Sequence, residues 1–172
     1  MMTTILTTDR LRLRTFEPED AALVAEYVGD WDVCSKLTRV PYPYTREMAD
    51  QWVASHNASP DIICAIEVDG AFAGCIAQEL EYGYWLGKPF WGKGIMTEAS
   101  RAFVTYLFEE EGMHDLGASF FKDNPASGVV LKRCGFEVTG ESKVFCLARD
   151  AEVDRYDVTT NRHVWEDLKD SW

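Results

Sequence analysis

The sequence has no long apolar run and no segment of biased composition. None of its segments approaches the roughly 18 consecutive apolar residues that a membrane-spanning helix requires. Residues 1–6 lack the basic segment and long apolar core of a secretory signal. The chain also contains no internal repeat and no linker rich in Gly, Ser or Pro. We therefore expect a single domain over residues 1–172 that is cytoplasmic and not attached to a membrane.

Metal ligands and positive charge are also scarce. The five cysteines are widely spaced without a C-x-x-C pair, and the three histidines share no metal-ligand spacing. We expect no metal site, and we expect Cys64, Cys75 and Cys134 to be buried hydrophobic side chains. The 17 basic and 29 acidic residues give a net charge of −12, which argues against nucleic acid as a partner. The acidic charge suits a cationic substrate such as an amine, or serves only solubility.

What the sequence does contain is a series of alternating helical and extended patterns. In its first part, apolar and polar residues alternate over residues 11–16, which predicts a half-buried strand. Pro18 and the acids around it favour a helix start, and this helix should run to Val28. A second helix should begin after Thr45, which is a good N-cap. We expect its apolar face to carry Met48, Trp52 and Val53.

The rest of the chain continues the alternation. Asp69-Gly70 is a strong hairpin signal between the expected strands 62–68 and 72–78. Residues 79–86 read as the next strand, and apolar residues at helical spacing follow until Gly112. The remaining expected elements are a strand over 116–121, a helix from Asn124 to Cys134, and two antiparallel strands within 136–160. This order predicts a mixed sheet with helices on its faces.

The most informative segment is residues 84–99, where an apolar strand leads through two glycines into a helix. Gly92 and Gly94 have no Cβ, so a ligand can approach their backbone N–H groups closely. The start of a helix adds unpaired N–H donors and partial positive charge, and Lys93 adds a full charge. These features favour a phosphate, although the glycines alone are also compatible with a tight turn. The spacing matches neither nucleotide-binding loop, G-x-x-x-x-G-K-[ST] or G-x-G-x-x-G.

A second segment, residues 123–136, places Asn124 and Ser127 between a strand and a helix. With the first segment it makes the chain resemble the GNAT acetyltransferase superfamily, most closely its RimJ/RimL-like branch. The matching stretches are TDRLRLR (8–14), GYWL (83–86), WGKG (91–94), TEA (97–99), NPAS (124–127), LKRCGF (131–136) and residues 154–165. The resemblance implies an α/β (α+β) fold with a mixed, mostly antiparallel central sheet, a splayed strand pair and helices on both faces.

The resemblance also implies acetyl-CoA as the co-substrate. Its pyrophosphate would lie on the backbone of residues 91–96, and its pantetheine arm and acetyl carbonyl on the backbone of residues 85–86. Asn124 would contact it from the following helix. The implied binding residues are Trp85, Leu86, Trp91, Gly92, Lys93, Gly94, Ile95, Met96 and Asn124. The Gln or Arg that often opens the glycine motif is Pro89 here, so one charged contact is absent while the backbone contacts remain.

The expected reaction is direct acyl transfer, in which a neutral amine attacks the thioester and the thiolate takes a proton as it leaves. Leu131 stands where many superfamily members have a tyrosine as general acid, so Ser127 is the catalytic candidate, as in the RimJ/RimL-like branch. Glu81 is the preferred general base and Glu79 the alternative, because residues two apart share a strand face. That face is also compatible with simple solvation.

The sequence therefore predicts an acetyl-CoA-dependent N-acetyltransferase, acting as a monomer or homodimer. Its acceptor would be a primary amine, either a protein N-terminal α-amine or a small molecule. The alternative is a non-catalytic module of the same fold that binds or senses acyl-CoA.

Overall fold

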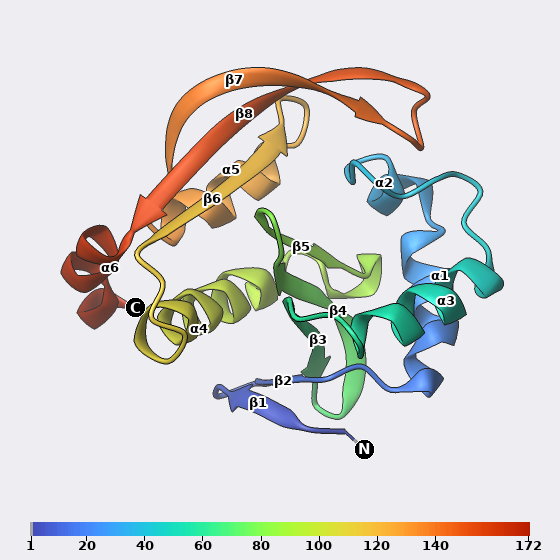
Figure 1. Ribbon diagram of the computed structural model, residues 1–172, viewed down its shortest axis with the longest axis horizontal. Helices are drawn as coiled ribbons and strands as arrows, with labels where there is room; N and C mark the ends of the chain where they lie inside the picture. Colours follow the sequence, from blue (N-terminus) through green and yellow to red (C-terminus); the bar gives the residue numbers. More distant parts are fainter. Residues whose placement is uncertain (1) are drawn as a thin grey trace.

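The computed structural model describes residues 2–172, whose strands form one sheet (Figure 1). The strands are β1 (Thr4–Thr7), β2 (Leu11–Arg14), β3 (Ile62–Val68), β4 (Ala71–Gln78), β5 (Tyr82–Leu86), β6 (Asp115–Phe121), β7 (Glu137–Cys146) and β8 (Ala151–Asn161). Their order is β1-β2-β3-β4-β5-β6-β8-β7. Neighbouring strands are antiparallel except β5 and β6, which are parallel. The mixed, mostly antiparallel sheet is therefore confirmed.

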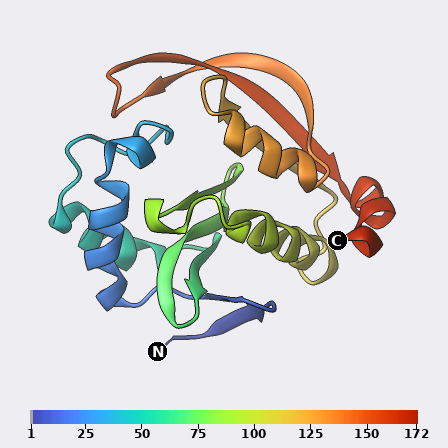
Figure 2. The same ribbon diagram turned by 180° about the vertical axis from the view of Figure 1, so that it is seen from behind.

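Helices cover both faces of the sheet (Figures 1 and 2). They are α1 (Ala21–Val28), α2 (Trp31–Cys34), α3 (Arg46–His56), α4 (Ile95–Glu109), α5 (Pro125–Arg133) and α6 (Arg162–Leu168), with 3-10 turns η1 (Pro18–Asp20), η2 (Lys88–Phe90) and η3 (Lys169–Ser171). Side chains of β3 alternate between two cores, as the two-residue period of a strand requires. Cys64 and Ile66 face the core under α4 and α5, whereas Ile63 and Ala65 face the core under α1 and α3.

Local sequence signals placed most elements correctly. Thr45 caps α3, accepting a hydrogen bond from the Met48 N–H at 3.2 Å. The β3–β4 hairpin turns at Asp69-Gly70, and Asp150 takes a positive φ of 50° in the turn between β7 and β8. The side chain of Met48, expected on the apolar face of α3, is exposed instead.

Three further differences concern elements and burial. β1, α2 and α6 were not predicted, because four to seven residues carry too little periodicity to be recognised. The strand expected over residues 79–86 begins only at Tyr82. Arg14, expected on the polar side of a half-buried strand, is buried and pairs with Asp20 and Glu67 at 2.8 Å. Burial of a charge is possible there because both carboxylates neutralise it.

All five cysteines are free and buried, as expected for the three in apolar surroundings. Burial raises the pKa of the Cys64 thiol to about 12, so it behaves as a small hydrophobic group. Among residues 2–172, no helix is long and apolar enough to cross a membrane. The same residues contain no group of three or more metal-ligating side chains.

Candidate active site

The sheet opens between β5 and β6, next to the glycine segment. β5 pairs with β4 along its whole length, from Tyr82 opposite Gln78 to Leu86 opposite Gly74. With β6 it shares a single pair, Tyr82 and Ala118, after which the two strands diverge (Figure 1). The backbone of β5 beyond Tyr82 therefore has a free edge facing the gap. This is the splayed pair that the sequence resemblance implied.

The glycine loop joins the end of β5 to the start of α4. Gly92 and Gly94 have φ values of 70° and 73°, a conformation that costs glycine little and other residues more. A Cβ at Gly92 would meet no atom within 4 Å, so the backbone is open on that side. Gly94 is the N-cap of α4, whose first-turn N–H groups have no partner within the helix. The strand, glycine turn and helix start are thus present, and they offer donors suited to a phosphate.

Two side chains hold the loop in place. The Trp91 indole folds back and donates from Nε1 to the Leu86 carbonyl at 2.7 Å. On the other side, Arg10 donates from Nη1 to the Lys93 carbonyl at 2.9 Å and from Nε to Glu98 at 2.6 Å. Trp91 was expected to act through its backbone alone. The sequence analysis gave Arg10 no role, because nothing local in the sequence places the β1–β2 turn beside α4.

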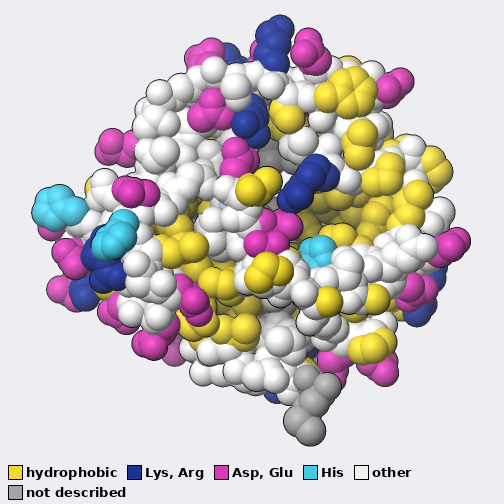
Figure 3. All heavy atoms as spheres, in the orientation of Figure 1, with side chains coloured by type: hydrophobic (Ala, Val, Ile, Leu, Met, Phe, Trp, Pro, Cys, Tyr) yellow, Lys and Arg dark blue, Asp and Glu magenta, His cyan; other side chains and the backbone are white. Residues whose placement is uncertain are grey.

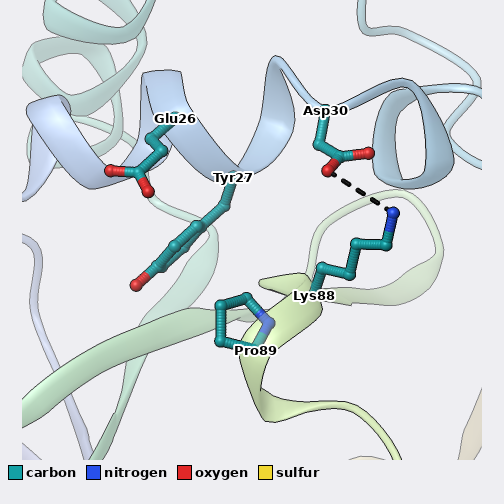
Figure 4. Close-up of a pocket in the computed structure, with 5 residues that line it drawn as sticks. All are labelled: Glu26, Tyr27, Asp30, Lys88 and Pro89. Carbon is teal, nitrogen blue, oxygen red and sulfur yellow. Dashed lines mark ion pairs between the residues drawn. The ribbon is translucent and has the colours of Figure 1, made fainter.

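A pocket lies on each side of this loop. The first, of about 370 Å³, is formed between α1 and η2 by Glu26, Tyr27, Asp30, Lys88 and Pro89 (Figure 4). The Lys88 ammonium lies 3.8 Å from Asp30 (Figure 4) and donates to Asp32, which fastens η2 to the start of α2. The second, a groove of about 750 Å³, runs along α4 from Gly94 to the C-terminal turn.

Ser127 and Asn124 lie where α5 begins, across the gap from β5. The Ser127 hydroxyl is 2.8 Å from the hydroxyl of Tyr84, which comes from β5. Asn124 occupies the N-cap position, but its side chain makes no capping hydrogen bond. The helix therefore begins after Asn124 as expected, and the Asn124 side-chain amide is not committed to the helix. Sequence reasoning did not single out Tyr84, since its partner is 43 residues away.

The two candidate bases do not share a strand face. Glu79 and Glu81 lie in the turn between β4 and β5, where the Glu79 N–H donates to the Glu81 carbonyl at 3.3 Å. Arg39 donates to the Glu79 carboxylate at 2.9 Å, and the Arg155 guanidinium lies 3.4 Å from Glu81. The argument from strand periodicity was therefore wrong. Both carboxylates are members of ion pairs, Glu79 with Arg39 and Glu81 with Arg155 on β8.

An ion cluster lies at the loop between β6 and α5. Asp123, next to Asn124, accepts two hydrogen bonds from Arg149 at 2.6 and 3.1 Å and one from Lys36 at 3.3 Å. The hydrogen bonds from Arg149, and secondarily Lys36, lower the pKa of Asp123. Arg149 also donates to the Ser35 carbonyl at 2.6 Å. The cluster thus ties the β7–β8 turn, the end of α2 and the β6–α5 loop together.

An apolar rim borders this cluster. Figure 3 shows hydrophobic side chains gathered at the upper right, where α2 and the end of the β7–β8 hairpin lie in Figure 1. The large exposed hydrophobic side chains of these segments are Trp31, Phe145 and Leu147. The Leu147 N–H donates to the Thr38 carbonyl at 3.1 Å, so the hairpin end and the segment after α2 are in direct contact.

Comparison with known proteins defines the class. The structure of the microcin C7 self-immunity acetyltransferase MccE, in complex with acetyl-CoA and AMP, has the same fold with a TM-score of 0.77. The two are 17% identical, and the match covers 90% of this chain and 93% of that one. Residues 10–137 match the family model of the acetyltransferase (GNAT) domain. The match spans well over half of the sequence, and the chain belongs to the GNAT acetyltransferase family.

Its relatives agree with the RimJ/RimL-like resemblance. YdaF of Bacillus subtilis (strain 168) is 27% identical over 157 residues, which cover 83% of this chain and 86% of that protein. The [ribosomal protein uS5]-alanine N-acetyltransferase of Escherichia coli (strain K12) is 35% identical over 80 residues. That match covers 46% of this chain and 39% of the relative. The relatives of this chain therefore include a ribosomal-protein N-acetyltransferase.

Proposed function

We propose that this protein transfers an acetyl group from acetyl-CoA to a primary amine, with a protein N-terminal α-amine as the first candidate acceptor. The observation that carries the proposal is the position of the glycine loop at the mouth of the β5–β6 gap. A diphosphate held on that loop leaves the rest of an extended molecule free to enter the gap. The similarity to the uS5-alanine acetyltransferase supports an α-amine acceptor, and the acetyl-CoA complex of MccE supports the co-substrate.

The chain offers a separate group for each part of the co-substrate. The open backbone at Gly92, and N–H groups through Ile95 and Met96, suit the pyrophosphate. The free edge of β5 at Trp85 and Leu86 suits the pantetheine amides and the acetyl carbonyl. Asn124 would add a side-chain contact from α5. Arg10 braces the loop through the Lys93 carbonyl, while its charge is paired with Glu98.

The reaction follows from these positions. The amine nitrogen attacks the thioester carbon, the N–C bond forms, and the C–S bond breaks as the thiolate departs. N–H donors on β5 stabilise the oxyanion of the tetrahedral intermediate. Ser127 donates a hydrogen bond to the departing sulfur. Glu81, once it has left Arg155, takes the proton that the ammonium must lose before attack. The buried free cysteines fit a reducing, cytoplasmic setting.

Release of free CoA tests the proposal directly. A thiol reagent is used to follow CoA release from acetyl-CoA over a panel of small amines and N-terminal peptides. We expect turnover with at least one peptide α-amine, and a slower rate for Ser127→Ala at unchanged acetyl-CoA affinity. An unchanged rate in Ser127→Ala would rule this residue out as the hydrogen-bond donor to the departing sulfur.

A second candidate function is a sensor that binds acyl-CoA without turnover. The observation that favours it is that both candidate bases are held in ion pairs, while Leu131 supplies no hydroxyl. Tight binding of acetyl-CoA in calorimetry, together with no CoA release on any amine, would establish the sensor and refute the enzyme.

A further inference from the structure

Tyr84 and Ser127 form a hydrogen-bonded pair that bridges the two sides of the gap. Tyr84 lies on β5 and Ser127 in the first turn of α5, and their hydroxyl oxygens are 2.8 Å apart. The Tyr84 hydroxyl is also 3.1 Å from the Ser127 carbonyl oxygen, which can accept its hydrogen instead of Ser127 Oγ. Among residues 2–172, no other side chain lies within hydrogen-bond distance of the Ser127 hydroxyl.

The tyrosine has a single hydrogen to donate, and this limits the arrangement of the pair. If it donates to the Ser127 carbonyl, the serine hydroxyl is left to donate to the tyrosine oxygen. If it donates to Ser127 Oγ, the serine hydrogen is free to point into the gap. Burial raises the pKa of the Tyr84 hydroxyl, which the Ser127 hydrogen bond only partly offsets, so the tyrosine stays protonated as a donor.

The neighbouring positions supply no substitute. Leu131, one turn further along α5, is buried in the core and has no hydroxyl. Tyr82 shares the face of β5 with Tyr84, but its ring packs on Phe103 and Phe136 and its hydroxyl has no partner among the described residues. Tyr84 is therefore the tyrosine that reaches Ser127.

We propose that Tyr84 is a positioning residue that donates to Ser127 Oγ and so turns the serine hydrogen toward the departing sulfur. This inference rests on the proposed acetyl transfer. Neither hydroxyl is consumed in the reaction: the N–C bond forms, the C–S bond breaks, and the proton lost by the amine ends on the sulfur or in solvent. Tyr84 strengthens the serine as a donor because hydrogen bonds in a chain polarise one another.

The test compares Tyr84→Phe with Tyr82→Phe, a matched loss of one hydroxyl from the same face of the same strand. We expect Tyr84→Phe to lower kcat about 3- to 10-fold, the worth of one hydrogen bond, with an unchanged KM for acetyl-CoA. Tyr82→Phe should leave both constants unchanged. The double variant Tyr84→Phe/Ser127→Ala should be no slower than Ser127→Ala alone, since the two hydroxyls act as a unit.

A second variant guards against loss of folding. Fluorotyrosine at position 84 keeps the shape of the ring and is a stronger donor, so its kcat should equal or exceed that of the natural chain. The positioning role would be overturned if Tyr84→Phe left kcat unchanged, or if the losses in kcat of Tyr84→Phe and Ser127→Ala multiplied in the double variant. Acetyl transfer itself would still stand. A natural chain that releases no CoA with any amine would overturn the transfer and this inference with it.

Discussion

Replacement of Gly92 by leucine should separate ligand binding from backbone strain. Gly92 has a φ of 70° and open space on its Cβ side. A side chain in the left-handed region costs roughly 1–2 kcal/mol. For a chain of this length that cost lowers the melting temperature by about 2 to 8 °C. Because the side chain would also occupy the space proposed for the pyrophosphate, one charge-assisted contact should be lost. A contact worth about 1.5–3 kcal/mol raises the Kd for acetyl-CoA about 10- to 100-fold.

Gly112 provides a matched control for this prediction. Its φ is 69°, and a Cβ there also meets nothing within 4 Å, but it lies beyond the far end of α4. Gly112→Leu should therefore lower the melting temperature by a similar amount and leave acetyl-CoA binding unchanged. Thermal unfolding and isothermal titration calorimetry measure the two quantities. Equal Kd values for the two variants would refute the assignment of the loop.

Three other changes test the supports around the site. Arg10→Met removes the contacts that brace the loop. Because the Arg10 side chain is half-exposed, the KM for acetyl-CoA should rise only about two- to fivefold, at constant kcat, in steady-state kinetics. Asp20→Asn leaves buried Arg14 with one carboxylate partner, so urea unfolding should show a loss of about 3 kcal/mol; a loss under 1 kcal/mol would contradict the buried pair. The lowered pKa of Asp123 means that its pairing with Arg149 stabilises the fold above about pH 4 and is lost as pH falls through the folded pKa. Asp123→Asn should therefore unfold about 0.5–1 kcal/mol more easily at pH 7, and the difference should narrow in urea titrations below pH 4; a pH-independent difference would contradict the ion pair.

The sequence predicted the strand, glycine turn and helix start well because their signals are local. Gly92 and Gly94 need positive φ, and the apolar period after them marks α4, so the loop was visible within about ten residues of chain. The alternation of Cys64 and Ile66 with Ile63 and Ala65 reflects a sheet covered on both faces. In each case the residues that define the feature are neighbours in sequence.

The other side of the site is built from contacts between distant segments, which no period reveals. Arg10 reaches Glu98 across 88 residues, and Arg149 reaches Ser35 across 114. The contact of Tyr84 with Ser127 joins residues 43 apart in the same way. The prediction that Glu79 and Glu81 share a strand face failed because a two-residue spacing implies a shared face only where the chain is extended, and these residues lie in a turn.

The choice between the two carboxylates now depends on how firmly each is held. Glu79 accepts a hydrogen bond of 2.9 Å from Arg39, whereas Glu81 accepts one of 3.2 Å from the Ser119 hydroxyl and lies 3.4 Å from Arg155. If Glu81 turns toward an amine, Arg155 keeps its pair with Asp157 at 3.2 Å, so no buried charge is left alone. If Glu79 turns away, it gives up the shorter contact and the guanidinium loses its carboxylate. We therefore still infer that Glu81 is the base, because its ion pair is the looser one and not because of a strand face.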